Sequence, residues 1–392
     1  MLFTTVVAAS ALFLQRFGVP AGEKAINIVG FIGLGAAVVG LARGALVLDR
    51  VRFSAFLLLF ALAVGGLAYN QVFPNRFGVA PSQQSLFQFL LFSGFATLSF
   101  ARPVPEDVFF RRMNALFGLV AAAGIAQFVA QLAGLGLFAF RGLVPDKVLF
   151  EDGYNLQIPA GFGGLFKSNG FFLLEPSIFS QVMALALMIE VLSFLRLRFL
   201  LLFAAGLLLS MAGTGWLVIA AFVLAIIVGM GWRGLAVAAA TLVAIAGIGL
   251  VVALFAPDAA DAFSGRLGEV FLPRTSGHLR FVTPFWLLAD VLRLQPDALW
   301  AGLGGGVSER VPLSYEYNVN TPVKVGLEYG LPALGAYLVL LVGGHRTARQ
   351  RILVAPCLVL LMFTGGYQQF PPLLFLVLLV ISVARLEPTA RA

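Results

Sequence analysis

Residues 167–195, KSNGFFLLEPSIFSQVMALALMIEVLSFL, carry the pattern that decides the fold of this chain. A polar segment that contains Lys167 and Glu175 leads into an apolar run that begins at Pro176. Proline is common at the first position of a helix, and about 20 apolar residues are enough to cross a bilayer. We therefore predict a membrane-spanning helix over 176–195, with a polar approach on one side of the membrane.

The rest of the chain repeats this apolar pattern. Of its 392 residues, 60% are hydrophobic and 11% are charged, whereas soluble domains carry about 25% charged residues. An ordinary soluble enzyme and a disordered protein are excluded, and the single Cys357 excludes a disulfide scaffold. We predict an all-α, polytopic integral membrane protein that forms one membrane domain over 1–392. Its apolar runs predict about twelve transmembrane helices, near 2–15, 25–42, 54–69, 85–101, 113–135, 176–195, 198–211, 214–230, 233–255, 323–343, 351–364 and 371–385.

Basic residues are distributed unevenly over the predicted loops. With the N-terminus in the cytoplasm, the inner loops and the C-terminal end hold these arginines: Arg43, Arg50, Arg52, Arg102, Arg111, Arg112, Arg196, Arg198, Arg233, Arg346, Arg349, Arg351, Arg385 and Arg391. They outnumber the acidic residues there, whereas the outer segments are nearly balanced. Cytoplasmic loops of membrane proteins are enriched in Lys and Arg. This asymmetry predicts that both termini are cytoplasmic, and it explains the net charge of +8 without a nucleic-acid partner.

Two outer segments are long, one over 136–175 and a larger one over 256–322, between the ninth and tenth predicted spans. Short hairpins are enough to connect helices, so the larger loop suggests chemistry or recognition on the outer face. Within it, Thr283-Pro284 predicts a short helix with Phe285, Leu288 and Leu292 on one face. That helix either lies in the membrane interface or packs as an ordinary loop helix.

Several common catalytic signatures are absent from the sequence. There is no phosphate-binding Gly-x4-Gly-Lys-Ser/Thr loop, and the two histidines, His278 and His345, offer no metal-ligand spacing. No metal and no cofactor are therefore expected.

Glu175 is the first candidate site residue. It precedes Pro176, so it occupies the N-cap of the predicted helix, where the helix dipole stabilises a carboxylate. A carboxylate at the membrane surface is also suited to deprotonate an incoming hydroxyl group. Both roles, cap and general base, stay open at this point.

The larger outer loop and the segment after it hold the other polar candidates. Arg280 precedes the predicted loop helix, and arginine binds phosphate through two parallel hydrogen bonds. The other candidates for substrate binding are Arg266, Arg274, Asn320, Lys324 and Glu328. For Asn320 and Lys324, helix capping and interfacial snorkelling are the alternatives.

Taken together, these blocks resemble the O-antigen ligase and Wzy-type polymerase superfamily. The resemblance rests on Gly-Phe-Phe-x-x-Glu-Pro at 170–176, the outer loop with Arg280, Gly-x-Gly at 302–304, and Asn320 ahead of Glu-x-Gly-Leu at 328–331. It extends from about residue 160 to residue 345.

The resemblance implies an enzyme that joins glycans carried on undecaprenyl diphosphate, at the periplasmic face of the bacterial inner membrane. An acceptor hydroxyl attacks with inversion and the sugar–diphosphate bond breaks, so neither ATP nor a metal is expected. Residues at the positions of Lys167 and Arg280 hold the diphosphate. A chain-length regulator and a flippase are the protein partners that such a polymerase implies.

Ligases of this superfamily carry a histidine directly before the asparagine, in the pattern His-Asn-x9-Gly. Here Asn320 and Gly330 have that spacing, but Val319 takes the place of the histidine. We therefore favour a polymerase of oligosaccharide repeats, with Glu175 as the candidate base. The alternatives are a ligase that transfers glycan to lipid A core with another base, and a transporter or flippase. A transporter is expected to carry its polar site near the bilayer midplane.

Overall fold

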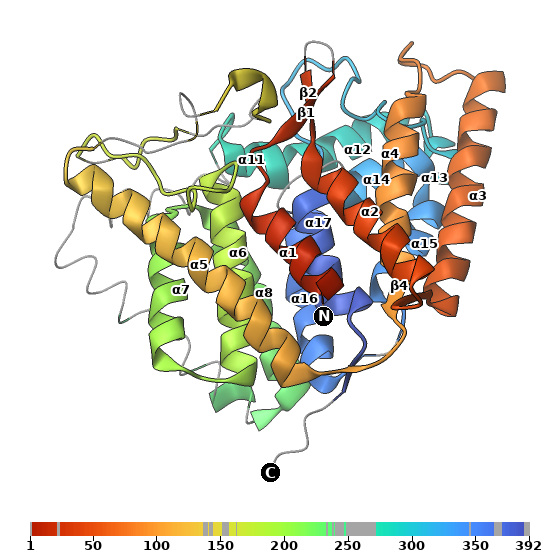
Figure 1. Cartoon of the computed structure of the whole chain (residues 1–392). Coiled ribbons are helices and arrows are strands. Elements are labelled where there is room, and N and C mark those ends of the chain that lie inside the picture. Colours follow the sequence, from red (N-terminus) through yellow and green to blue (C-terminus); the bar gives the residue numbers. More distant parts are fainter. Residues whose placement is uncertain are drawn as a thin grey trace.

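The computed structural model describes residues 2–21, 24–135, 140, 144–150, 157–161, 163–232, 234–236, 239, 247, 272–344, 346–363 and 371–387. Helices make up most of it, and the long ones run between two ends of the molecule (Figure 1). Helices α1 and α5 begin at the end where the C-terminal strand β6 lies, which we call the termini end. The opposite end is called the loop end.

The longer helices are α1 (Leu2–Phe13), α2 (Ile28–Ala42), α3 (Arg50–Val72), α4 (Gln83–Gly94), α5 (Glu106–Leu132), α6 (Pro176–Ser193), α7 (Leu197–Leu209), α8 (Gly213–Met230), α15 (Leu331–Val342), α16 (Ala348–Phe363) and α17 (Pro371–Leu378). Helices α11 (Ser276–Phe281), α12 (Thr283–Leu294), α13 (Ala298–Ala301) and α14 (Thr321–Tyr329) lie on the side of the loop end (Figure 1). Single turns are η1 (Phe95–Thr97), η2 (Asp146–Val148) and the π-helical η4 (Leu379–Val383).

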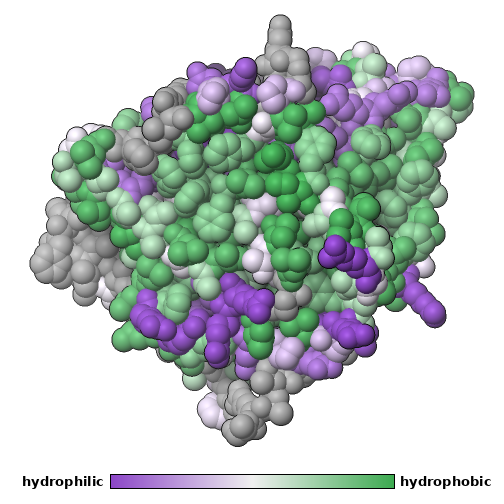
Figure 2. Space-filling view, in the orientation of Figure 1, coloured by the Kyte–Doolittle hydropathy of each residue, from purple (hydrophilic) through white to green (hydrophobic). Residues whose placement is uncertain are grey.

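On the face shown in Figure 2, apolar side chains form a belt across the middle of the molecule, and hydrophilic side chains gather towards both ends. Within the described residues, α3, α5, α6 and α8 are long and apolar enough to cross a membrane. Shorter apolar helices run beside them, namely α1, α2, α7, α15 and α17 with η4. A belt of this kind is typical of side chains that face lipid. The protein is therefore a mostly helical, polytopic membrane protein.

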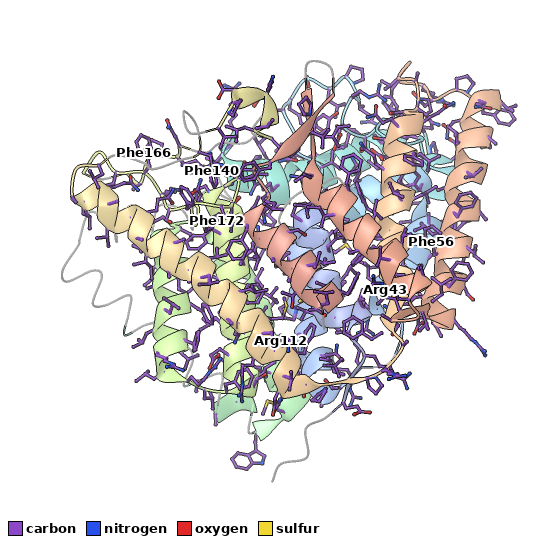
Figure 3. The ribbon with its side chains drawn as sticks, viewed as in Figure 1. Arg43, Phe56, Arg112, Phe140, Phe166 and Phe172 are labelled. Carbon is purple, nitrogen blue, oxygen red and sulfur yellow. The ribbon has the colours of Figure 1, made fainter. Side chains whose placement is uncertain are left out.

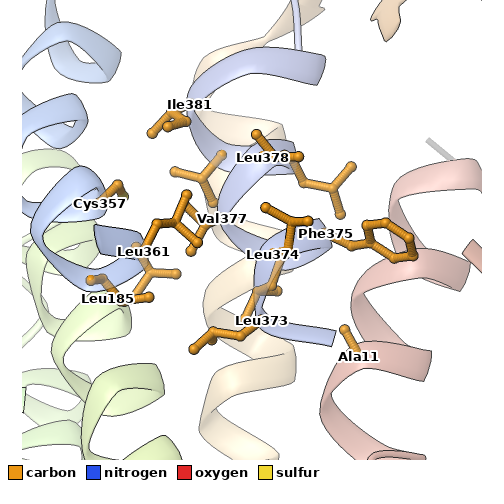
Figure 4. Close-up of a cluster of buried hydrophobic side chains, with 14 of the residues drawn as sticks. Ala11, Leu185, Cys357, Leu361, Leu373, Leu374, Phe375, Val377, Leu378 and Ile381 are labelled. Carbon is orange, nitrogen blue, oxygen red and sulfur yellow. The ribbon is translucent and has the colours of Figure 1, made fainter. Parts of the chain in front are cut away.

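The core is built around α17 and η4. Every residue from Pro371 to Ala384 is buried. Figure 4 shows Leu373, Leu374 and Phe375 packed among side chains of α1, α6 and α16. A helix that is apolar on all sides needs neighbours on all sides. The last predicted span is therefore the centre of the bundle, and the α1–α2 and α6–α8 groups are arranged around it.

The predicted span over 323–343 is interrupted. It forms two helices, α14 and α15, that meet at Gly330, whose φ is +87°. A Cβ atom at this position would lie 2.2 Å from the carbonyl oxygen of Trp300. Glycine alone tolerates both the left-handed backbone and the close approach of α13. The break separates a short polar helix, α14, from the apolar helix α15.

A further difference from the predicted spans concerns 85–101, and the predicted span over 233–255 is not tested. The helix α4 ends at Gly94 and continues as η1 and the strand β4 (Leu98–Phe100). Most of 233–255 lies outside the described residues.

The prediction of an all-α protein misses three short strand pairings. The strands β1 (Gly18–Ala21) and β2 (Lys24–Asn27) form a hairpin, β3 (Leu46–Leu48) pairs with β4, and β5 (Val104–Pro105) pairs with β6 (Leu386–Glu387). All three lie where helices end, and they satisfy backbone groups of the connecting segments. Periodicity does not reveal strands of two to four residues.

The predicted loop helix is present as α12. Leu287 and Val291 are buried, Leu288 and Leu292 are half-buried, and Phe285 is exposed. The buried stripe of α12 packs on the Gly302–Val307 turn and on α14. Its placement in the membrane interface stays a prediction.

Figure 3 labels Arg43 and Arg112, two arginines of the predicted inner loops, at the termini end. Other arginines of these loops are paired with nearby carboxylates. Arg349 forms ion pairs with Glu106 at 3.2 Å and with Asp107 at 2.7 Å. These contacts join the start of α16 to the start of α5.

Candidate functional site

The polar blocks singled out in the sequence all lie on the side of the loop end. The first block runs from Lys167 to Glu175 and reaches α6 from the loop between α5 and α6. Gln127 of α5 fixes this segment, because its Oε1 atom accepts hydrogen bonds from Ser168 Oγ and from the backbone N–H of Asn169, both at 3.2 Å. These hydrogen bonds anchor the segment to helix α5.

The Gly170-Phe171 pair makes a tight left-handed turn, with φ values of +71° and +63°. Such a φ is costly for phenylalanine, and strained residues of this kind often lie at functional sites. Asn169 Oδ1 accepts from the backbone N–H of Phe171 at 3.1 Å, and the buried Arg16 donates to the Phe171 carbonyl at 3.1 Å. At Gly170 a Cβ atom would lie 2.7 Å from the ring of Phe179. The Gly-Phe-Phe motif is thus explained by the turn that leads into α6.

Lys167 is almost fully buried. Its Nζ atom donates a hydrogen bond to the carbonyl oxygen of Met211 at 3.1 Å, at the end of α7. Lys167 is therefore held between α5 and the α7–α8 connection, and one of its three N–H donors is used by a protein carbonyl.

Glu175 occupies the N-cap of α6, as its position before Pro176 predicted. Its side chain forms no capping hydrogen bond, and its Oε2 atom accepts instead from Ser177 Oγ at 2.7 Å. The half-buried carboxylate therefore lies beside the helix start, with Ser177 fixing one oxygen. An oriented carboxylate that is not used as a cap is suited to accept a proton.

Arg280 lies in α11, which begins after the N-cap Thr275. The side chain is half-buried, and its guanidinium makes no hydrogen bond or ion pair with any of the described residues. Asn320 Nδ2 lies 3.5 Å from the Arg280 carbonyl oxygen, so the second and third blocks meet here. A partly desolvated guanidinium without a protein partner is a ready binding group for an anion.

The other two arginine candidates are less constrained. Arg274 is exposed, has a φ of +66°, and lies just before α11. Arg266 lies outside the described residues.

The third block begins at Asn320, which caps α14 by accepting from the backbone N–H of Val323 at 3.2 Å. The capping alternative for Asn320 is therefore correct. The interfacial snorkelling of Lys324 is not found, because Lys324 is buried. It forms ion pairs with Glu309 and with Glu328, the latter at 3.6 Å.

Glu328 completes this group from one turn further along α14. Its Oε1 atom accepts from Ser308 Oγ at 2.6 Å, and its buried Oε2 atom has no hydrogen-bond partner by geometry within the described structure. Sequence reasoning missed Ser308 and Glu309. They follow the Gly302–Gly306 turn, and no local pattern reveals that this turn passes over α14.

The second and third blocks contact each other, whereas the first block, with Glu175, is connected to them through α16. Arg280 and Asn320 are in direct contact, and Thr321 Oγ1 donates to the Leu361 carbonyl of α16 at 2.9 Å. The helix α6, which carries Glu175, also packs against α16. No contact between Glu175 and Arg280 occurs among the described residues, so α16 is the element that both blocks share.

No group of three or more His, Cys, Asp or Glu residues that could hold a metal ion occurs in the part of the chain that the structure describes.

The sequence matches a known family, described as WcaD colanic acid polymerase, over residues 3–321. This region contains Lys167, Glu175, Arg280 and Asn320, and it ends before Lys324. No curated protein and no solved structure matches the chain. Because the match covers well over half of the sequence, the chain belongs to the WcaD colanic acid polymerase family, in agreement with its resemblance to Wzy-type polymerases.

Proposed function

We propose that this protein joins undecaprenyl-diphosphate-linked oligosaccharide repeats into a surface polysaccharide, such as an exopolysaccharide, a capsule or O-antigen, at the periplasmic face of the inner membrane. Membership of the family implies a polysaccharide polymerase with glycosyltransferase-type activity on a lipid-linked glycan in the membrane. The proposal goes beyond the family in three points, namely the undecaprenyl diphosphate carrier, the periplasmic face of the membrane and the inverting mechanism. They are supported by the guanidinium of Arg280, which is half-buried and has no hydrogen-bond or ion-pair partner among the described residues.

The orientation follows from the charge distribution. Arg43 and Arg112 of the predicted inner loops lie at the termini end, and Arg349 pairs there with the start of α5, so the positive-inside rule assigns that end to the cytoplasm. The blocks with Glu175, Arg280 and Asn320 then face the periplasm. The proposal keeps about twelve spans, one of which is interrupted at Gly330.

The reaction exchanges one bond for another. The oxygen of an acceptor hydroxyl forms a bond to the anomeric carbon of the donor sugar, and the bond from that carbon to the diphosphate breaks. Glu175 accepts the hydroxyl proton, and undecaprenyl diphosphate leaves with the electron pair. Attack from the side opposite the diphosphate inverts the anomeric carbon, and the broken bond supplies the energy without ATP or a metal.

Arg280 is the group best placed to stabilise the leaving diphosphate. Charge develops on the bridging oxygen as the bond breaks, and a preorganised cation at that point lowers the barrier. Arg274 lies on the same segment, and Arg266 precedes it in the chain. Lys167 is engaged by Met211, so it contributes only after leaving that carbonyl.

Deleting the gene in its host and separating lipid-linked from surface glycans by size tests the proposal. We expect single repeats to accumulate while long chains disappear, and the restored gene to restore the ladder. Long polymer that stays on the lipid carrier would instead identify a ligase, with a base other than the histidine that Val319 replaces. Repeats trapped on the cytoplasmic side would identify a flippase, and both results contradict the polymerase proposal.

A further inference from the structure

A cluster of aromatic rings lies next to the Arg280 segment. It consists of His278 of α11, Trp286 of α12, and Tyr315 and Tyr317 of the chain that leads to α14, and we call it the aromatic face. The centroids of His278 and Trp286 are 5.2 Å apart, those of Trp286 and Tyr315 are 5.8 Å apart, and those of the two tyrosines are 6.3 Å apart. Neighbouring rings are steeply inclined, as in edge-to-face pairs.

Trp286 is the open member of the aromatic face. It is 48% exposed, whereas His278 is buried and the two tyrosines are half-buried. The rings of His278 and Tyr315 therefore hold the indole in place while much of its surface stays accessible. A large aromatic ring fixed in this way offers contact area at a low entropic cost.

Hydrogen-bonding groups surround the indole. Tyr315 donates its hydroxyl to Asp290 Oδ2 at 2.8 Å, and burial together with this hydrogen bond raises the pKa of Tyr315, so the phenol stays protonated. The other carboxylate oxygen of Asp290 has no hydrogen-bond partner among the described residues. Glu316 and Asn318 are exposed on the same segment as the tyrosines.

A second exposed tryptophan lacks such a ring cluster. Trp300 of α13 is 67% exposed and makes no ring contact with the described residues. It also has a carboxylate nearby, because Asp297, three residues earlier, accepts a hydrogen bond from the Tyr69 hydroxyl at 3.1 Å. The rings of His278 and Tyr315 are therefore what distinguish Trp286 from Trp300.

We infer that the aromatic face is a binding subsite for the glycan, in which a sugar ring stacks on Trp286 and a sugar hydroxyl donates to Asp290. The C–H groups on one side of a pyranose pack against an aromatic ring, whose face is electron-rich, while its hydroxyls reach acceptors at the edge. The inference rests on the proposed function and adds a place for the growing chain next to Arg280. Polymerisation requires such a place, because the product of one step is a substrate in the next.

Direct binding of a glycan tests this subsite apart from the polymerase activity. The probe is the lipid-free repeat oligosaccharide, released from the host polymer by partial hydrolysis and added to the full chain in nanodiscs. We expect Trp286→Ala to weaken binding about tenfold, and Asp290→Asn about fivefold. Trp300→Ala is the matched control and should change the Kd less than twofold. Equal binding by wild type and Trp286→Ala would overturn the subsite.

The fluorescence of Trp286 separates a glycan from lipid. The difference between wild-type and Trp286→Phe emission reports this ring alone. We expect the oligosaccharide to change that difference, and nanodiscs of brominated phosphatidylcholine to leave it unchanged. Quenching by the brominated lipid would show that the ring lies in the membrane and would overturn the inference. Because neither measurement requires polymer to form, failure of the subsite and failure of the proposed function are distinguishable.

Discussion

Two arginines at opposite ends of this membrane protein, Arg196 and Arg280, have different surroundings. At the termini end, the buried Glu190 accepts hydrogen bonds from Arg196 Nε at 2.9 Å, from Arg196 Nη2 at 2.7 Å and from Asn114 Nδ2 at 2.8 Å. At the loop end, Arg280 is half-buried and makes no such contact with the described residues.

The difference indicates which charges support the fold and which are available to a ligand. A buried ion pair with complete hydrogen bonding fixes two segments but offers nothing to a substrate. A partly desolvated arginine without a protein partner contributes little to stability and much to the binding of an anion. We therefore expect substitution of Arg196 to lower the stability of the protein, and substitution of Arg280 to lower its activity.

The largest effect is expected at Glu175. Glu175→Gln keeps the size of the side chain but removes the proton acceptor, so polymer formation per molecule should fall by about 10²- to 10⁴-fold. The level of the protein in the membrane should not change, because the side chain does not cap α6. Polymer is measured by size separation and protein by immunoblot. A wild-type amount of polymer in this variant would show that Glu175 is not the general base.

Arg196→Ala tests the other side of the comparison. It leaves the Glu190 carboxylate buried without its cation, which costs about 3–5 kcal/mol. We expect a lower melting temperature in detergent and less protein in the membrane, with unchanged activity for each molecule that remains. The double variant Glu190→Met with Arg196→Met should regain much of the stability, because no charge is then left unpaired. A stable Arg196→Ala protein without activity would contradict the division between the two ends.

Arg280→Ala is expected to reduce polymer by about 10²- to 10³-fold, the usual effect of removing one preorganised charge-stabilising group. The melting temperature should stay within the error of the wild type. Arg293→Ala is the control, because Arg293 is an exposed arginine of the neighbouring helix α12. Equal polymer from the two variants would show that Arg280 does not bind the diphosphate.

The smallest effect is expected at Ser177. Its hydroxyl fixes one oxygen of Glu175 at 2.7 Å, and a single hydrogen bond to a charged group contributes about 1.5–3 kcal/mol. Ser177→Ala should slow polymerisation about tenfold, while Ser177→Thr, which keeps the hydroxyl, should restore most of the rate. A loss as large as that of Glu175→Gln would mean that Ser177 has a larger role than positioning.

The apolar helices, the N-cap at Glu175 and the loop helix α12 could be predicted from the sequence, because each depends on neighbours in the chain. The contacts that build the site could not. Glu309 meets Lys324 only because the glycine turn folds over α14, and Gly330 interrupts a predicted span because α13 approaches from the side.

The aromatic face shows the same limit. Trp286 and Tyr315 belong to separate elements, and their contact follows from the return of the chain across α12 after the glycine turn. Nothing in their local patterns indicates this. In the same way, the sequence predicts that Arg280 lies on the outer side, but only the fold reveals that its guanidinium has no partner among the described residues.

The most direct test of the central claim is a reaction with purified components. The full chain is placed in vesicles with the host's undecaprenyl-diphosphate-linked repeat and with EDTA, and the lipid-linked products are separated by size. We predict a ladder of joined repeats and release of undecaprenyl diphosphate, with no ladder from the Glu175→Gln protein. Single repeats that remain unjoined in the presence of well-folded wild-type protein and its intact substrate would contradict the account.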